Sequence, residues 1–403
     1  MIRGYRIKIF PNEEQKKMIH KSFGCSRFIY NWCIDEIQNN YDKNKKVFST
    51  FDLNNKITIL KQQNEYKWLN DVSTAMLKAT AKDCSNAYKN WFKHIKKNGI
   101  TYSKKTLKKC SMQNRKPTIK ESEYYPRYKT RKSEQKCPTR TDRMTFNGRY
   151  VHLEKIGNVK LSKVKIDLDG KLMNARLSFD GIDYWLSFAI EYKDIQLEEK
   201  PKTEPIGIDL GIKTLVYCSN QTTFKKPRTT LIDKKIKRLQ RKASKRYQKM
   251  IDYCKETRTK FSDLTKSNNL IKIEKQLRKY QIKKTNILNN NIHNITSKLM
   301  KLNPERITIE DLDIKGMMSN HKMARYVQSA KFYEIRRQLT YKCEKNNIKL
   351  VVADRYFKSS KTCSECGSIK HDLKLKDRVY RCPHCGAVID RDYNAAINLS
   401  RIS

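Results

Sequence analysis

The chain has 403 residues, which is enough for two or three folding units, and it carries 88 Lys and Arg against 41 Asp and Glu. The formal charge of +47 strains a compact state unless a polyanion offsets it, so nucleic acid is the expected partner and a membrane surface the competing one. No run of about 18 apolar residues occurs, and the N-terminus has the pattern of a strand rather than a signal peptide, which predicts an intracellular protein outside the membrane.

The first half of the chain changes pattern three times. Residues 5–10 alternate polar and apolar side chains and predict a strand, and helical spacing follows from Asn12. Residues 93–140 hold sixteen Lys and Arg against three acids, with tyrosines interleaved, a mixture that suits a nucleic-acid track. Alternation returns between about residues 144 and 193. We therefore expect one β-barrel that contains the first strand and is interrupted by the helical segment.

A linker at residues 198–205 separates this half from the next. After a hairpin-like start, residues 231–301 have helical spacing and carry 21 Lys and Arg against five acids. Because apolar residues are sparse there, we expect two long helices that lie over a groove rather than fill a core.

Two CxxC pairs near the C-terminus carry the strongest metal signal. Fifteen residues separate Cys363 and Cys366 from Cys382 and Cys385. This spacing predicts a four-cysteine zinc ribbon, in which four thiolates close a tetrahedral Zn²⁺ site that is structural rather than catalytic. The other eight cysteines are scattered, and we expect them to be reduced and buried.

Three acids stand at the ends of predicted elements. Asp209 and Glu310 each follow a short β-branched or apolar strand, and Asp392 opens an alanine-rich helix. Each of them is a weak signal alone. Together they supply the carboxylates that two divalent ions, about 3.5–4 Å apart, need to hold a scissile phosphate, and Mg²⁺ prefers such oxygen ligands.

The motifs around these residues resemble a known family. GIDLGIK, ITIEDL, SSKTCSECG, YRCPHCG and DRDYNAAINL, in this order, resemble the RuvC-type half of the TnpB and Fanzor nucleases, whose core type V CRISPR effectors share. YRIKIFPNEEQ, FGCSRFIYN, AYKNWF and YPRYKTRK also resemble TnpB, so the likeness spans nearly the whole chain.

The resemblance implies an α+β multidomain fold. A wedge β-barrel would comprise residues 1–11 and 144–198, with a helical recognition domain, residues 12–143, inserted in it. An RNase H-like (RuvC) nuclease domain would comprise residues 199–358 and 387–403, with the basic helical insertion 231–301. A zinc ribbon that binds target nucleic acid would occupy residues 359–386.

The resemblance also implies an activity, that of an RNA-guided DNA endonuclease encoded by a transposable element. Such a protein cuts DNA beside a short target-adjacent motif, and Asp209, Glu310 and Asp392 would be its RuvC carboxylates and Mg²⁺ ligands. Their neighbours Asp311, Asp313 and Asp390 would be structural or solvent-facing. The partners would be a guide RNA and double-stranded DNA, held by a monomeric ribonucleoprotein in the nucleus of a eukaryotic or virus-infected cell or in the bacterial cytoplasm.

Contacts to nucleic acid follow from the same likeness. Thr50, Asn54, Thr74 and Lys78 fall near the positions from which family members read the motif, although their identities differ from those of other members. Arg127 and Lys129, in the YPRYKTRK segment, are further candidate contacts.

Other functions fit parts of the pattern. An RNA-independent transposase or recombinase uses the same carboxylate fold but recognises transposon ends itself. A non-catalytic nucleic-acid-binding regulator would need only the ribbon and the basic helices, although it gains nothing from carboxylates near phosphates. A junction resolvase fits less well, because of the ribbon and the long N-terminal half.

Overall fold

The computed structural model describes residues 2–44, 47–131, 133–163, 166–193, 201–374 and 377–402, except for the side chain of residue 262. It divides into two compact units, Met1–Ile195 and Gln196–Ser403. The boundary predicted between residues 198 and 199 lies outside the described residues. Each unit combines helices with a sheet, which confirms an α+β fold.

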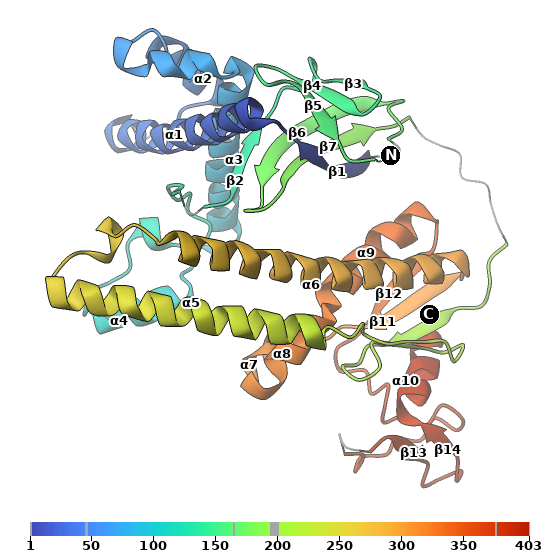
Figure 1. Ribbon diagram of the computed structural model, residues 1–403. Helices are drawn as coiled ribbons and strands as arrows, with labels where there is room; N and C mark the ends of the chain where they lie inside the picture. Colours follow the sequence, from blue (N-terminus) through green and yellow to red (C-terminus); the bar gives the residue numbers. More distant parts are fainter. Residues whose placement is uncertain are drawn as a thin grey trace. The chain divides into compact units, whose positions relative to one another are not determined.

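The first unit is built on an antiparallel sheet with the chain's first strand in its middle (Figure 1). β1 (Ile2–Phe10) pairs with β7 (Tyr184–Glu191) on one side and with β5 (Gly157–Leu161) on the other. The prediction that the first strand shares a sheet with the hairpins after residue 144 is thus confirmed. Among the described residues the strand order is β2-β6-β7-β1-β5-β4-β3, an open series. The remaining strands are β2 (Gln135–Pro138), β3 (Thr145–Asn147), β4 (Tyr150–Leu153) and β6 (Lys171–Phe179).

Helices inserted between β1 and β2 complete the first unit. The Asn12 side chain accepts a hydrogen bond from the backbone N–H of Gln15 at 2.8 Å and so caps α1 (Glu13–Asn44), the predicted helix start. α1 packs on α3 (Thr74–Asn98), and both share one buried cluster with β1 and β7. The other helical segments are α2 (Thr50–Leu60), η1 (Asn64–Asp71), α4 (Lys104–Met112) and η2 (Ile119–Glu121).

Strand β2 lies inside the range predicted to be helical. It pairs with β6 and buries Cys137 and Pro138. Four residues are too few to show an alternation, and the surrounding stretch is dominated by Lys and Arg, so the sequence pattern does not reveal this strand.

The second unit contains a mixed sheet. β8 (Ile206–Asp209), β11 (Arg306–Glu310) and β12 (Lys349–Ala353) run parallel, and β9 (Val216–Cys218) and β10 (Thr223–Phe224) extend the sheet antiparallel beyond β8. Parallel neighbours need long crossovers, which helices supply here. The carboxyl ends of all three parallel strands therefore meet at one edge of the sheet.

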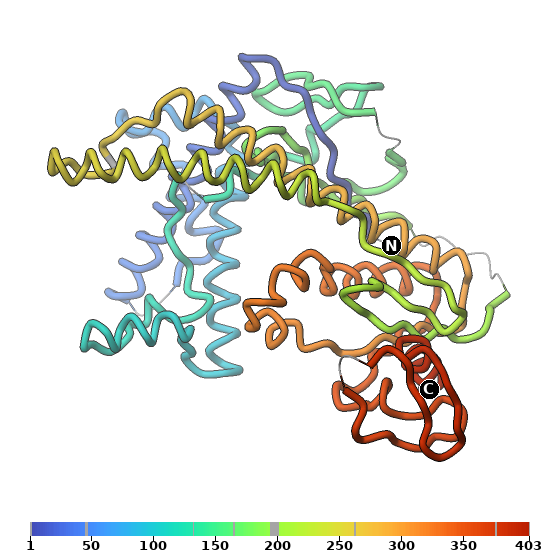
Figure 2. The backbone as a smooth tube through the Cα atoms, turned by 60° about the horizontal axis from the view of Figure 1, so that its bottom comes forward, coloured from blue at the N-terminus to red at the C-terminus, as the bar shows by residue number. Residues whose placement is uncertain are grey.

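The predicted pair of long basic helices is confirmed. α5 (Thr230–Thr257) and α6 (Asn268–Lys301) lie side by side in both views (Figures 1 and 2). Among the described residues of α5 only Ala243 is buried. The expectation that this stretch fills no core is wrong for the end of α6, where apolar side chains keep helical spacing and enter the core of the second unit. These residues are Leu288, Ile292, Ile295 and Leu299.

The C-terminal part of the second unit is a small hairpin followed by a helix. β13 (Val379–Arg381) pairs with β14 (Val388–Asp390), and α10 (Arg391–Ser400) returns to pack on β8. Seven of the eight scattered cysteines are buried and Cys254 is half-buried, close to what the sequence predicts. The remaining elements are η3 (Phe261–Asp263), α7 (Ile314–Ser319), α8 (His321–Ala330) and α9 (Phe332–Lys345).

Candidate active site and cysteine centre

Asp209 and Glu310 are the last residues of two neighbouring parallel strands. β8 and β11 pair in register, Ile208 beside Ile309, so the acid that follows each isoleucine reaches the same edge of the sheet. The preceding residues are buried on both faces of the sheet, while both acids are half-buried. The strands thus deliver two carboxylates side by side at the boundary between core and solvent.

Helix α10 brings the third acid to this edge. Gly207 lies two residues before Asp209, and a Cβ atom there would stand 2.0 Å from the carbonyl oxygen of Ala396 and 2.3 Å from the backbone nitrogen of Ser400. Only glycine allows so close an approach of helix to strand. The contact sets the distance between β8 and α10, and Asp392 lies in the first turn of that helix.

The electrostatics of the three acids show that they share an environment. Burial, then the charges of Asp392 and Glu310, raise the pKa of Asp209 to about 7. Burial also raises the pKa of Glu310, and burial followed by the charge of Asp390 raises that of Asp392. Asp392 lies 3.8 Å from a guanidinium nitrogen of Arg378, too far to neutralise it fully. Without a cation, the carboxylates repel one another.

The neighbouring acids have local structural contacts. Asp311 accepts hydrogen bonds from Arg336 and Arg355. Asp313 accepts from the backbone of Gly316 and caps α7. Asp390 accepts from the backbone of Asp392 and its neighbour and caps α10. These three acids are therefore occupied in ways that Asp209, Glu310 and Asp392 are not.

The four cysteines of the CxxC pairs are gathered more tightly than the acids. Their sulfur atoms all lie within 4.8 Å of one another, with 3.7 Å between Cys363 and Cys385 and 3.6 Å between Cys366 and Cys382. Four thiolates at about 2.3 Å from one tetrahedral ion would be about 3.8 Å apart, so the spacing fits. In the described part of the chain, this is the only group of three or more Cys, His, Asp and Glu close enough to hold a metal ion.

Local geometry favours the thiolate form of two of the four cysteines, while the neighbouring sulfurs raise the pKa of Cys385. Gly367 and Gly386 have φ of 77° and 73°, which close the two CxxC turns. The backbone N–H of Cys385 points at the sulfur of Cys382 and lowers its pKa to about 5, and Ser368 lowers the pKa of Cys366 to about 7. A thiolate, not a thiol, binds a metal.

Two buried asparagines of α10 hold the cysteine segment. Asn394 accepts a hydrogen bond from the backbone N–H of Ser364 at 2.8 Å and donates to the carbonyl oxygen of Thr362 at 2.7 Å. Asn398 donates to the carbonyl oxygens of Ser359 and Thr362. The helix that carries Asp392 therefore also fastens the first CxxC turn, a link that no local sequence signal reveals.

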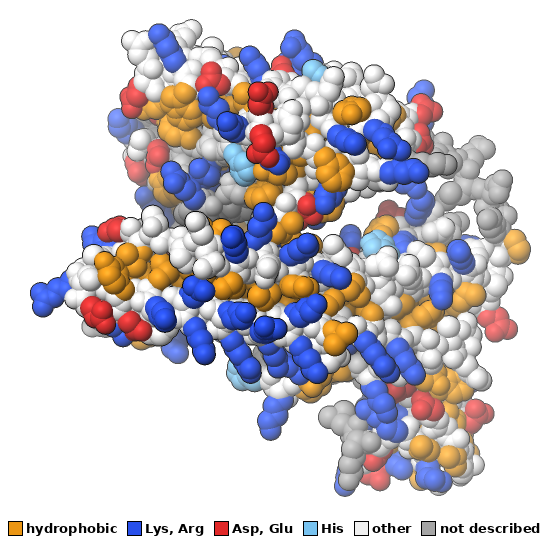
Figure 3. All heavy atoms as spheres, in the orientation of Figure 1, with side chains coloured by type: hydrophobic (Ala, Val, Ile, Leu, Met, Phe, Trp, Pro, Cys, Tyr) orange, Lys and Arg blue, Asp and Glu red, His pale blue; other side chains and the backbone are white. Residues whose placement is uncertain are grey.

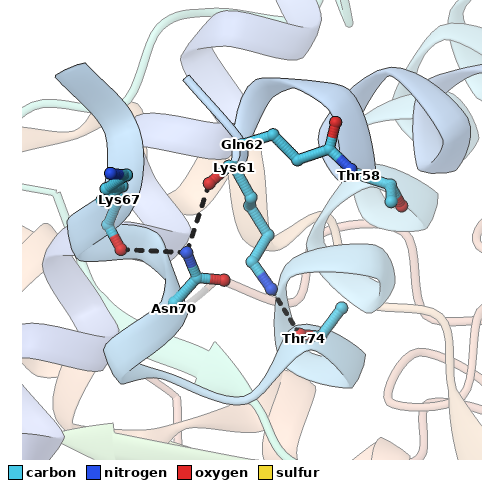
Figure 4. A pocket seen from close by; sticks show the side chains of 6 residues that line it. All are labelled: Thr58, Lys61, Gln62, Lys67, Asn70 and Thr74. Carbon is cyan, nitrogen blue, oxygen red and sulfur yellow. Dashed lines mark hydrogen bonds between the residues drawn. The ribbon is translucent and has the colours of Figure 1, made fainter. Parts of the chain in front are cut away.

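Four of the predicted nucleic-acid contacts in the first unit lie on two helices, α2 and α3. Thr50 opens α2 and Asn54 lies in it, with the buried side-chain oxygen of Asn54 accepting no hydrogen bond from described residues. Thr74 opens α3 and accepts from Lys61 Nζ at 2.6 Å (Figure 4), and Lys78 is exposed one turn later.

Lys61 and Lys67 line a pocket with Thr74, Thr58 and two amide side chains, Gln62 and Asn70. These two lysines are not among the contacts predicted from the sequence, although the charge in the segment between α2 and α3 could have indicated them. Burial, then the charges of Lys78 and Lys155, lower the pKa of Lys61. An unneutralised cation at this place favours an anionic ligand.

Of the other two candidates, only Arg127 is free to reach a ligand as an exposed side chain. The Lys129 ammonium lies 3.5 Å from the centre of the Tyr30 ring, and burial lowers its pKa. Its backbone N–H donates to the Asn31 side chain. These contacts favour a packing role for Lys129 over a phosphate contact.

Comparisons with known proteins cover the same elements. A model described as "Helix-turn-helix domain" matches residues 1–46, of which the described residues form β1 and one long helix rather than two helices. A model described as "Probable transposase" matches residues 187–321, and a "Cas12f1-like, TNB domain" matches residues 332–399. A TnpB-like protein of Acanthamoeba polyphaga mimivirus is 27% identical over 426 residues, covering 100% of this chain and 73% of the relative. This chain is thus similar to a TnpB-like protein along its whole length.

Two further relatives extend the comparison. A candidate RNA-guided DNA endonuclease of Streptomyces pristinaespiralis is 26% identical over 408 residues, covering 98% of this chain and 88% of the relative. A solved Cas12f1–sgRNA–target DNA complex has a protein with a TM-score of 0.52 at 12% identity, covering 99% of this chain and 98% of that one, so the two share a fold. Within the described residues, no helix is long and apolar enough to cross a membrane.

Proposed function

We propose that this protein is an RNA-guided DNA endonuclease of a transposable element, which cuts DNA beside a short motif by hydrolysis at Asp209, Glu310 and Asp392. One observation carries the proposal: two parallel strands and one helix bring these carboxylates to the same sheet edge, where burial and mutual repulsion raise the pKa of Asp209. The strand order β9-β8-β11-β12, with a helix packed on β8, supports an RNase H-like core.

The three carboxylates offer the oxygen donors that divalent cations of the Mg²⁺ type prefer, although in the described residues they are not gathered as tightly as the cysteine sulfurs. A bound cation would favour the charged form of Asp209, which burial and the charges of Asp392 and Glu310 disfavour. Such ions, when bound, supply an activated water and stabilise the leaving oxygen in an in-line displacement. Asp209 feels the charges of both other acids, which supports its holding such cations together with Glu310 and Asp392.

The cysteine centre is proposed to hold one structural Zn²⁺ on Cys363, Cys366, Cys382 and Cys385, which makes residues 359–386 a zinc ribbon. The sulfur spacing and the lowered pKa of Cys382 support this assignment. All four positions around such an ion are taken by protein, so the ribbon binds no substrate through it. It would bind target nucleic acid beside the carboxylates.

A guide RNA and double-stranded DNA are the proposed partners of a monomeric ribonucleoprotein. The names of relatives include RNA-guided endonucleases, and the solved complex of similar fold holds RNA and DNA. Figure 3 shows Lys and Arg side chains gathered along α5. Six of them line one hollow on that helix, and we call them the α5 stripe: Lys234, Lys237, Arg238, Arg241, Lys242 and Lys245. A phosphate backbone is the partner that such a stripe favours.

In the first unit we propose the division of labour that the resemblance implies. The sheet built on β1 would be a wedge barrel that grips RNA, and the inserted helical segment would face the motif duplex. Thr50, Asn54, Thr74, Lys78 and Arg127 would contact nucleic acid, with the pocket around Lys61 supporting the position of Thr74 (Figure 4). Lys129 is the weakest of the proposed contacts, because it packs on Tyr30.

The test is Asp209→Ala. With guide RNA, Mg²⁺ and a matching target, we expect the cleavage rate to fall at least about 10³-fold, since a carboxylate proposed to hold the cations is lost. RNA binding should be unchanged. Glu344→Ala, which removes an exposed acid on α9, is the matched control and should cut normally. Cutting by Asp209→Ala at the rate of the natural protein would show the assignment to be wrong.

An RNA-independent transposase is the second candidate, favoured by the family model described as "Probable transposase" over residues 187–321. Expression of the gene with its flanking DNA, followed by sequencing of co-purified RNA, separates the two. One defined RNA species supports the guided nuclease. Absence of such an RNA, with strand transfer of the flanking ends, supports the transposase.

A further inference from the structure

Asp311, directly after Glu310, binds two arginines with its two oxygens. Oδ1 accepts from Arg336 of α9 at 2.7 Å, and Oδ2 accepts from Arg355, which follows β12, at 2.8 Å. β12 pairs with β11, and Ala353 is the partner of Glu310. Both arginines are therefore held at the sheet edge where the carboxylates gather.

The contact with Asp311 leaves most N–H donors of both guanidinium groups available. The side chains of Arg336 and Arg355 are 46% and 49% exposed, and within the described residues neither has a further hydrogen-bond partner. A guanidinium has five N–H donors, so most of them remain for acceptors in solution. One carboxylate between two arginines also leaves a net positive charge beside a cluster of acids.

An exposed aromatic ring completes the arrangement. Tyr356, next to Arg355, is 84% exposed. Its backbone N–H donates to Oδ1 of Asp354 at 2.7 Å, and the N–H of Phe357 donates to the Asp354 carbonyl oxygen at 3.0 Å. This turn is built from its own hydrogen bonds and does not depend on burying the tyrosine ring. A ring held outward beside two cations suits a single strand, because bases stack on rings while phosphates bind arginines.

We propose that Arg336, Arg355 and Tyr356 form a strand track, which holds single-stranded nucleic acid so that a phosphate reaches the three carboxylates. The inference rests on the proposed nuclease function and adds positioning residues to it. The two arginines bind phosphates flanking the scissile one, and Tyr356 stacks on a base. Asp311 fixes the arginines at the edge while itself standing back from the metal ligands. Two cations here also reduce the repulsion between an incoming phosphate and the acids.

The ion pairs could instead serve only to fasten β11 to α9 and to the turn after β12. The two roles differ in what they predict for Tyr356, which has no part in that fastening. They also differ in salt dependence, since a lost phosphate contact reduces the slope of log affinity against log salt by about 0.7 for a single strand, and a loosened fold does not.

The experiment is photocrosslinking of a mixed-sequence single-stranded DNA 20-mer carrying 5-iodouracil. The full-length protein, with whatever RNA co-purifies, is irradiated with this probe in Ca²⁺, and cross-linked peptides are mapped by mass spectrometry. We expect a cross-link in the segment that contains Tyr356, and Arg336→Ala/Arg355→Ala should reduce its yield at least about 5-fold. Target cleavage in Mg²⁺ should fall about 10-fold in the same variant and in Tyr356→Ala.

Matched controls are Arg337→Ala, the next residue on α9, which pairs with Glu334 instead, and Tyr333→Ala, another exposed tyrosine. Both should stay within about 2-fold of the natural protein. If the double variant does not fold, Arg355→Lys keeps the charge but loses the planar fork, and should cut about 3-fold more slowly. No cross-link near Tyr356, or equal losses in variant and control, overturns the track. A cross-link without any cutting by the natural protein contradicts the nuclease function but not the track.

Discussion

The carboxylate site and the cysteine centre lie in the same unit and share α10. They differ in whether their side chains are already arranged to bind a metal ion. The four sulfurs are already at the spacing of a tetrahedral site, with backbone N–H groups favouring the thiolate form of Cys382. The three acids are held near one another by a sheet and a helix, where burial and then mutual repulsion raise the pKa of Asp209 to about 7. A closed centre of this kind stabilises a fold, whereas an open, strained one is suited to exchange ligands and substrate.

The largest expected effect comes from breaking the closed centre. Cys382→Ser should lose bound zinc, because a three-ligand centre cannot close, and binding of zinc to such centres supplies on the order of 10 kcal/mol of folding energy. Hydrogen exchange should then rise across residues 359–390. Zinc content by atomic emission is the measurement. Cys254→Ser, on α5, should keep its zinc, and equal zinc content in both variants would contradict the comparison.

At the carboxylate site, the free energy of unfolding should change with pH in the opposite sense to that expected for an ordinary ion-paired acid. In metal-free protein the pKa of Asp209 is raised above its unfolded value of about 3.9, so its contribution to stability is complete below about pH 4 and is lost as pH rises through about 7. The loss is at most roughly 4 kcal/mol, since each pKa unit is worth about 1.4 kcal/mol.

Urea unfolding in EDTA at several pH values measures this loss. Asp209→Asn has no charge to bury, so it should unfold with a flatter pH profile and be more stable than the natural protein at pH 8. Mg²⁺ should restore part of the lost stability to the natural protein, and it should not stabilise the variant. A profile that is the same in both proteins would show that the site is not strained.

Gly207→Ala tests whether the helix contact builds the open site. A Cβ atom 2.0 Å from the Ala396 carbonyl forces β8 and α10 apart, at a cost of about 3 kcal/mol. Cleavage should be lost as Asp392 moves away, while zinc stays bound. Gly4→Ala, in strand β1 with open space around it, is the control and should change stability by less than about 1 kcal/mol. Thermal unfolding measures the loss of stability, and a cleavage assay measures the loss of the carboxylate site.

The smallest effect should come from the α5 stripe, which lies apart from both centres in the chain. Arg238→Ala/Arg241→Ala should weaken binding of the co-purified RNA about 3- to 10-fold, and the salt slope should fall by about 1 to 2. Lys249→Ala/Lys255→Ala, on the same helix but outside the stripe, removes equal charge. If both pairs of substitutions have the same effect on a filter-binding curve, the stripe is only a solvated face.

The two centres also differ in how far the sequence predicts them. The cysteine centre can be predicted from the sequence, because all four cysteines fall within 23 residues and each CxxC turn is local. Asp209 and Glu310 could be predicted from strands that end in an acid, but only the pairing of β8 with β11 makes them neighbours. The approach of α10 to Gly207 joins segments almost 190 residues apart, and no periodicity reports it.

The local charge of the sequence does not indicate how an individual lysine is packed. Lys129 stands in a basic, tyrosine-rich segment, yet its ammonium is engaged with the Tyr30 ring, whereas Lys61 lies in a less conspicuous stretch and lines a pocket. The apolar spacing at the end of α6 is hidden by its Asn and Lys neighbours, so its burial was missed. Long-range packing decides all three cases.

The double duty of α10 has a consequence for biosynthesis. The helix supplies Asp392 and, through Asn394 and Asn398, ties down the first CxxC turn, and it follows every strand of the second sheet in chain order. A ribosome that has made everything up to residue 390 therefore presents two carboxylates without the third, on a sheet whose β8 is still uncovered. The proposed site of a nascent chain therefore stays incomplete until α10 has been made and has packed on β8.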